Sequence, residues 1–155
     1  MKNHPKAREF CLQFLYHYQL PIFEPEKKLN SKEYDSVQIF ERIDAFKTTL
    51  NVLLDTAEQA YLATMIKGLF THLDEVESLL EKYLKNWKLS RLSKIEHTLL
   101  LMSIYELKYQ PEVPFKVVIN EAIELAKKYS NKDAGSFVNG ILDAVYKNEV
   151  QNAKS

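Results

Sequence analysis

The hydrophobic residues between positions 93 and 146 recur at the spacing of α-helices. The segment 95–109 is apolar almost all the way round a helical wheel, as expected for a helix that other helices surround. Ser93 and Glu96 form a capping box at its start, and Pro111 ends it. We therefore predict a central helix over this segment.

Two amphipathic helices are predicted after the central one. Pro114 would lie in the first turn of the first, and Asp133 is a suitable N-cap for the second. The apolar stripe of the first comprises Val117, Val118, Ala122, Leu125, Ala126 and Tyr129. The stripe of the second comprises Phe137, Val138, Ile141, Leu142 and Val145.

Four further helices precede the central one. They are predicted over about 5–20, over about 36–50, from Asp55 onward, and over 73–84, with a proline-containing loop at 21–35. The core-facing residues are expected to be Ala7, Phe10, Cys11, Phe14, Leu15 and Tyr18 in the first helix, Val37, Phe40, Ile43 and Phe46 in the second, and Ala57, Tyr61, Met65, Ile66 and Leu69 in the third.

Composition narrows the fold class. The chain has 155 residues, which fits a single domain, and only 3 glycines, which leaves little material for tight hairpins. Alternating runs of β-branched residues are few. We predict an all-α fold of about seven helices in a single domain over 1–155. Its halves would cover about 1–70 and 71–148, and the tail 149–155 is expected to be flexible.

Charge and cysteine content limit where the protein works and what it binds. The 21 Lys and Arg residues balance the 21 Asp and Glu residues, so a nucleic-acid site would have to come from local clustering. The lone cysteine, Cys11, is expected to be a small buried hydrophobe. No apolar run reaches the roughly 20 residues that span a membrane. These features predict a cytoplasmic protein.

The sequence offers little to catalysis. Its 4 histidines form no H-E-x-x-H motif, no second cysteine suggests a zinc site, and no G-x-S-x-G or P-loop occurs. We therefore predict no enzymatic activity, no metal and no organic cofactor. Glu106 projects onto the apolar face of the central helix, where a hydrogen-bonded core carboxylate is favoured over a catalytic one.

Asn120 and Asn139 each interrupt a regular helix, in which asparagine is a mediocre helix former. We expect them to make hydrogen bonds between the last two helices, with Gly140 permitting close approach. This interpretation requires no ligand.

Several motifs resemble the family of the bacterial transcription antitermination factor NusB. The runs VPFKVVINEAIELAKKYS at 113–130 and FVNGILDAVY at 137–146 carry the resemblance, together with AREFCLQFLY at 7–16. The resemblance covers nearly the whole chain and is weakest from 21 to 54. It implies a NusB-like fold, in which two small helical bundles are packed together.

The function that this resemblance implies is RNA binding in transcription antitermination. The family pairs with the ribosomal protein NusE and binds a boxA-like element of single-stranded RNA in nascent ribosomal RNA transcripts. It does so within the RNA polymerase antitermination complex, without catalysis and without a membrane. A homodimer is an alternative state of the free protein.

The amino-terminal residues Lys2, His4, Lys6 and Arg8 are the expected basic part of the RNA site. By the resemblance they correspond to an arginine-rich segment, although His4 and Pro5 stand where arginines are usual. If about four phosphates are neutralised, RNA affinity falls roughly fifty-fold from 50 to 200 mM salt.

Tyr16 is the candidate aromatic residue of the RNA site. Helical spacing places it on the outward face of the first helix with Glu9 and Leu12, and Arg8 lies at the margin of that face. Periodicity alone leaves helix packing and base stacking open. The resemblance favours stacking of a base on the ring.

The resemblance also places Glu96, Asp133 and Phe137 on the RNA side. Leu101 stands where the family commonly has an arginine, and the pattern places it beside His97 on the least apolar side of the central helix.

Two other functional classes remain. The chain could be a targeting module similar to the RNA-binding domain of ribosomal RNA cytosine methyltransferases, although it carries no methyltransferase domain. It could instead be a helical protein-interaction domain whose RNA surface has eroded through His4, Pro5 and Leu101. Salt-dependent RNA binding would exclude this last class.

Overall fold

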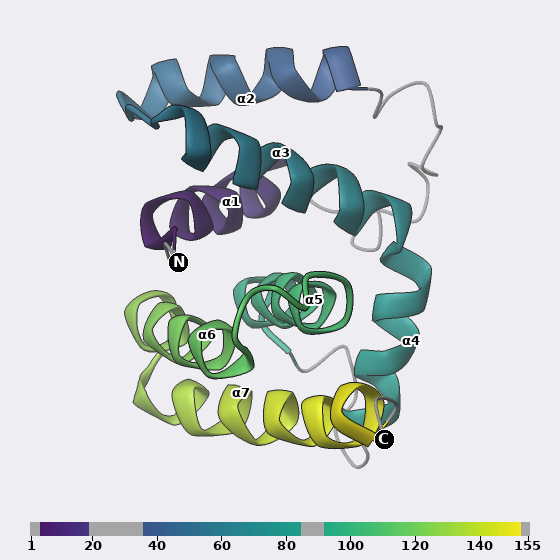
Figure 1. Ribbon diagram of the computed structural model, residues 1–155. Helices are drawn as coiled ribbons and strands as arrows, with labels where there is room; N and C mark the ends of the chain where they lie inside the picture. The colour runs from purple at the N-terminus through teal and green to yellow at the C-terminus, as the bar shows by residue number, and fades with distance from the viewer. Residues whose placement is uncertain (1–3, 19–35, 85–91, 153–155) are drawn as a thin grey trace. The chain divides into compact units, whose positions relative to one another are not determined.

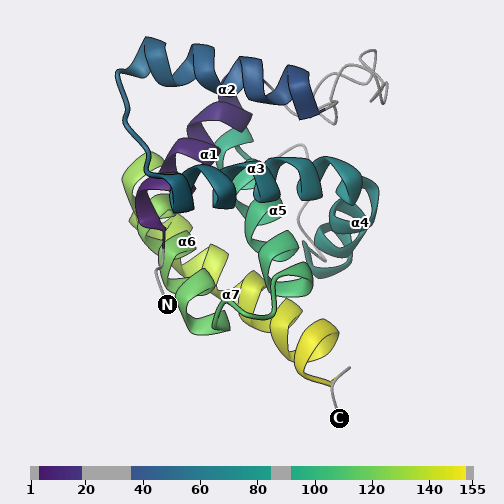
Figure 2. The same cartoon turned by 45° about the horizontal axis from the view of Figure 1, so that its top comes forward.

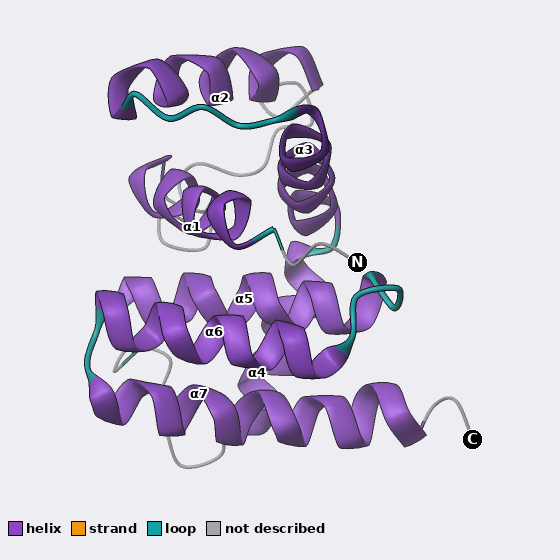
Figure 3. Ribbon diagram, turned by 60° about the vertical axis from the view of Figure 1, so that its left-hand side comes forward, coloured by secondary structure: helices purple, strands orange, loops and turns teal. Residues whose placement is uncertain are grey.

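The computed structural model describes residues 4–18, 36–84 and 92–152 of the chain. Every regular element among these residues is helical, and Figure 3 shows helices and loops without a strand in the part that it describes. The elements are α1 Pro5–Tyr18, α2 Ser36–Leu50, α3 Thr56–Thr71, α4 Leu73–Leu84, α5 Lys94–Tyr109, α6 Phe115–Tyr129, α7 Lys132–Val145 and the π-helix η3 Tyr146–Gln151. The predicted all-α fold of about seven helices is confirmed.

The helices form two compact units, His4–Thr71 and His72–Ser155, here called the amino-terminal and carboxy-terminal units. Among the described residues, no helix is both long enough and apolar enough to cross a membrane.

In the amino-terminal unit, α1 and α2 both pack against α3. Aromatic rings join α1 to α2: the Phe46 ring meets the rings of Phe10 and Phe14 edge-on, with centroids 5.4 and 5.9 Å apart. Edge-to-face contact is a favoured arrangement of aromatic rings. Cys11 is buried beside them on α1, as predicted.

The local signals that begin and end these helices are readable in the sequence. Asp55 caps α3, because its Oδ1 accepts from the Glu58 backbone N–H at 2.8 Å while Glu58 Oε1 accepts from the Asp55 N–H at 3.1 Å. At the end of α2, Asn51 takes a left-handed φ of 54°. The Val52 N–H then reaches the Lys47 carbonyl at 3.0 Å, which closes the helix and turns the chain toward α3 (Figure 2).

Two core predictions in this unit are wrong. Phe40 is 51% exposed and Ile39 is buried instead, since Ile39 and Ile43 lie one turn apart on the inward face of α2. In α3, Ala57 is exposed, whereas Leu62 belongs to the buried face. Ile39 and Phe40 are adjacent apolar residues, so spacing alone does not determine which of the two faces inward.

In the carboxy-terminal unit, α5 is the central helix, as predicted. Its residues from His97 to Leu107 are all buried, and α4, α6, α7 and η3 pack against it or against one another (Figure 1). Ser93 caps α5 as expected, because its Oγ accepts from the Glu96 backbone N–H at 3.1 Å. Glu106 is 2% exposed, as expected of a core carboxylate.

The beginnings of α6 and α7 differ from the prediction. Pro114 is the N-cap residue of α6 rather than a member of its first turn. Asn131, not Asp133, caps α7, because its Oδ1 accepts from the Ala134 N–H at 2.9 Å. Asp133 therefore lies in the first turn of α7, where a carboxylate suits the helix dipole.

The predicted contact through Asn120, Asn139 and Gly140 is wrong. Both asparagines are exposed, and a Cβ built at Gly140 would meet nothing within 4 Å. The close approach of α6 and α7 occurs at Gly135, where a Cβ would lie 3.2 Å from the Lys127 side chain. The two helices therefore approach each other near the start of α7, whereas Gly140 faces open space.

Candidate RNA-binding surface

The outward face of α1 is narrower than predicted. Lys6 and Tyr16 are exposed, and Tyr16 keeps 48% of its surface accessible. Glu9 and Gln13 are half-buried on the same side, one turn apart. This face offers one cation, polar side chains and an accessible phenol ring.

Leu12 and Arg8 do not belong to that face, in contrast to the prediction. Leu12 is 0% exposed and Arg8 is 3% exposed. Positions 8, 12 and 15 are three to four residues apart, so they share one side of the helix, and Leu15 on this side is buried too. The Arg8 guanidinium carbon lies 5.1 Å from the centroid of the Tyr61 ring, in a cation–π contact.

His4 lies directly before α1 in an uncommon backbone conformation. Its φ is 48°, and its carbonyl accepts from the Arg8 N–H at 2.9 Å. A left-handed residue that is not glycine costs on the order of 1–3 kcal/mol unless its surroundings hold it. The His4 ring is stacked on the Tyr61 ring, with centroids 4.9 Å apart and planes inclined by 19°.

Two of the predicted RNA-binding residues, His4 and Arg8, thus contact the ring of Tyr61 on α3. Tyr61 is predicted to face the core, whereas it is half-exposed. A pairing between residues so far apart in the sequence leaves no local signal. Lys2, the remaining predicted basic residue, lies outside the described part of the chain.

A second group of predicted residues assembles in the carboxy-terminal unit. Glu96 Oε1 accepts hydrogen bonds from Ser93 Oγ and from Ser130 Oγ, each at 3.0 Å. Because Ser130 ends α6, these bonds hold Glu96 at the turn between α6 and α7. Asp133 and Phe137 follow this turn on the first two turns of α7, where Asp133 is exposed and Phe137 is half-buried.

The chemistry of this second group suits nucleobases better than phosphates. Two carboxylates can accept hydrogen bonds from the amino groups of exposed bases, and an aromatic ring can stack on a base face. Asp133 and Phe137 are four residues apart, so they share one face of α7. Leu101 contributes nothing to this surface, because it is 0% exposed, and His97 one turn before it is buried as well.

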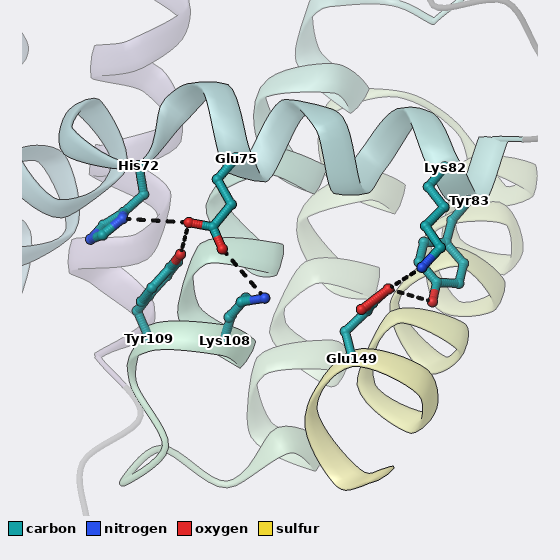
Figure 4. Close-up of polar contacts among 7 residues, drawn as sticks. All are labelled: His72, Glu75, Lys82, Tyr83, Lys108, Tyr109 and Glu149. Atoms are coloured by element: carbon teal, nitrogen blue, oxygen red, sulfur yellow. Dashed lines mark hydrogen bonds and ion pairs between the residues drawn. The ribbon is translucent and has the colours of Figure 1, made fainter. Parts of the chain in front are cut away.

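Polar contacts between α4 and α5 form a separate cluster around Glu75 (Figure 4). The carboxylate of Glu75 accepts a hydrogen bond from the Tyr109 hydroxyl, and Lys108 Nζ lies 3.4 Å from its other oxygen. The His72 ring stacks on Tyr109 at 4.0 Å. The hydrogen bond from Tyr109, followed by the nearby Lys108, lowers the pKa of Glu75, while burial and then the bond to Glu75 raise the pKa of Tyr109 to about 12.

A second polar cluster holds η3 against α4. Glu149 Oε1 accepts from Lys82 Nζ at 2.8 Å and from the Tyr83 hydroxyl at 3.0 Å (Figure 4). The Lys82 bond is the main reason that the pKa of Glu149 lies below its ordinary value. The tail that was expected to be flexible from position 149 is therefore anchored at Glu149 and helical as far as Gln151.

These clusters join helices within the carboxy-terminal unit. His97 Nε2 lies 2.8 Å from Glu77 Oε2, which adds a further, mostly buried pair between α5 and α4. Within the residues that the structure describes, no group of three or more His, Cys, Asp or Glu side chains could hold a metal ion.

Comparison with known proteins places the chain in a family. A model of the NusB family matches residues 5–147. The transcription antitermination protein NusB of Acetivibrio thermocellus is 34% identical over 149 residues, which cover 95% of this chain and 90% of that protein.

Two solved structures share the fold. One is T. maritima NusB, with a TM-score of 0.75, 26% identity, and coverage of 97% of this chain and 95% of that one. The other is a structure of the antitermination factors NusB and NusE in complex with dsRNA, with a TM-score of 0.72, 24% identity, and coverage of 95% and 98%.

Proposed function

The chain belongs to the NusB family, and from this premise we propose that it is an RNA-binding transcription antitermination factor. It pairs with the ribosomal protein NusE and binds boxA-type RNA in nascent ribosomal RNA transcripts, in the cytoplasm and within the antitermination complex of RNA polymerase. Two observations support the proposal: membership of the family, and the exposed side chains on α1.

The observation that carries the proposal is the exposure of Tyr16 in a helix that is buried along most of the preceding turns. Seven of the residues between Ala7 and Leu15 are buried, yet the next residue presents 48% of a large aromatic side chain to solvent. An aromatic ring that does not pack in the core is suited to stack on an unpaired base. The exposed Lys6 on the same helix can contact a phosphate.

The two groups of candidate residues have different roles in RNA binding. Lys6 on α1 and the basic residues before this helix supply charge, which positions RNA without reading its sequence. Glu96, Asp133 and Phe137 supply acceptors and a ring for bases. Because the net charge of the chain is zero, RNA alone should bind weakly, and the protein partner should add the remaining affinity.

Binding assays with purified full-length protein test this function. A labelled single-stranded boxA-like oligonucleotide and a scrambled one of equal length would be titrated with the protein, with and without NusE. We expect preference for the boxA-like RNA and tighter binding with NusE present. With about three phosphates neutralised, affinity should fall about twenty-fold from 50 to 200 mM salt.

Equal binding of both oligonucleotides, with no effect of NusE, would contradict the proposal. NusE binding without any RNA binding would instead identify a helical protein-interaction domain.

A further inference from the structure

We propose that Tyr61 is a positioning residue for RNA binding, whose ring fixes the conformation of His4 and the place of Arg8 at the entry to α1. The inference rests on the proposed function, because it assigns to α3 a part in the RNA site of α1. Tyr61 acts through its two neighbours rather than by touching RNA.

The geometry places both neighbours on one aromatic ring. The His4 imidazole stacks on Tyr61 at 4.9 Å, and the Arg8 guanidinium carbon lies 5.1 Å from the same centroid. Stacking and cation–π contacts of this kind are both attractive. All three residues belong to the amino-terminal unit, so the arrangement lies within one compact body.

His4 needs such a contact to keep its conformation. Its φ of 48° is unfavourable for a residue with a side chain, and the following Pro5 further restricts the backbone of His4, favouring extended conformations. The ring atom Nδ1 is buried and makes no hydrogen bond to any described residue. Stacking on Tyr61 is therefore the contact that holds this ring in place.

Loss of the Tyr61 ring should release His4 to an ordinary extended conformation. The entry to α1 would then lose its fixed conformation, and Arg8 would lose its aromatic neighbour. Fewer molecules would hold the basic residues ready for RNA, so the apparent affinity would fall in proportion to the population that remains competent.

The test compares Tyr61→Leu and Tyr61→Phe with the wild type in the full-length chain. For a boxA-like single-stranded RNA, we expect Tyr61→Leu to bind about fivefold more weakly per folded molecule, and Tyr61→Phe to bind normally because its ring can still stack. The slope of log affinity against log salt should shrink by about 0.7 for each phosphate that the variant no longer neutralises. In NMR spectra, the His4 ring protons of Tyr61→Leu should lose their ring-current shift.

The matched control removes a stacked tyrosine elsewhere. Tyr146 stacks on Phe115 with centroids 3.9 Å apart, and Tyr146→Leu should affect melting without changing RNA binding per folded molecule. If Tyr61→Leu does not fold, Tyr61→Met removes the ring while keeping an unbranched apolar side chain.

Unchanged affinity of the folded Tyr61 variants would overturn the inference. Weaker binding with the full salt slope would also overturn it, since Tyr61 would then contact RNA directly. If the wild type itself fails to bind RNA, the proposed function fails, and the His4 proton shifts separately show whether Tyr61 organises His4.

Discussion

Ser130 Oγ donates a hydrogen bond to Glu96 Oε1 at 3.0 Å, and this bond ties the start of α5 to the end of α6. The same carboxylate oxygen accepts from Ser93 Oγ at the cap of α5. Glu96 is therefore a structural link as well as a candidate RNA-binding residue. Its two roles can be separated by experiment.

Glu96→Ala should lower the free energy of unfolding by about 1–2 kcal/mol, because it leaves both serine hydroxyls without this acceptor. Glu96→Gln should cost less, since an amide oxygen can still accept. Urea unfolding measures the effect, with Glu112→Ala as a control at an exposed position. A stability loss for Glu112→Ala equal to that for Glu96→Ala would contradict the link.

Glu106→Ala should mainly lower stability. The side chain is almost fully buried, and removal of one partner leaves buried polar groups unsatisfied at a cost of about 1–3 kcal/mol. Thermal melting and RNA titration of the same sample separate the two readouts. Unchanged melting with abolished RNA affinity would instead make Glu106 a functional residue.

Lys6→Ala should weaken the binding of every RNA alike and reduce the salt slope by about 0.7, because Lys6 is an exposed charge on α1.

Arg8→Ala should behave differently from Lys6→Ala. Arg8 is buried against Tyr61, so this change should also lower the melting temperature. RNA titrations at two salt concentrations, with a melting curve for each variant, check both expectations. Identical behaviour of the two variants would contradict the assignment of Lys6 as an exposed charge and of Arg8 as a buried one.

Stability should decrease in acid through the cluster around Glu149. Its pKa in the folded protein lies below the ordinary value of 4.5, so the unfolded chain binds a proton more readily. The stabilisation is therefore present above pH 4.5 and is lost as the pH falls through the lower, folded pKa. In Glu149→Gln, the free energy of unfolding, measured with urea between pH 3 and about 6, should depend less on pH. An unaltered pH dependence would show that the contacts of Glu149 with Lys82 and Tyr83 do not contribute to stability.

Local sequence signals predicted most of the fold. The bounds of α2, the capping at Ser93 and at Asp55, and the buried length of α5 all follow from periodicity and cap chemistry. Rotation of a helix is harder to predict where apolar residues stand side by side. Leu12 and Phe40 were assigned to the wrong sides for this reason.

The candidate site was predictable only in part. Tyr16 could be placed outward because it lies outside the predicted core stripe of the first helix and shares its side of that helix with Glu9. The stacking of His4 and Arg8 on Tyr61, and the anchoring of Glu149 by Lys82, join residues from distant helices. Such pairs depend on how helices pack, and no spacing within the sequence encodes them.

The exposed ring of Tyr16 provides the most direct test of the RNA-binding account. Tyr16→Ala should weaken binding of boxA-like RNA by roughly 1–3 kcal/mol, with nearly the same salt slope, because stacking is removed and charge is not. Tyr16→Phe should keep most of the affinity, and both variants should melt close to the wild type since the side chain is half-exposed. The decisive measurement is the RNA binding isotherm of Tyr16→Ala per folded molecule: a weakened isotherm restored by Tyr16→Phe is the predicted result, and normal RNA binding by a variant that melts early would contradict the account.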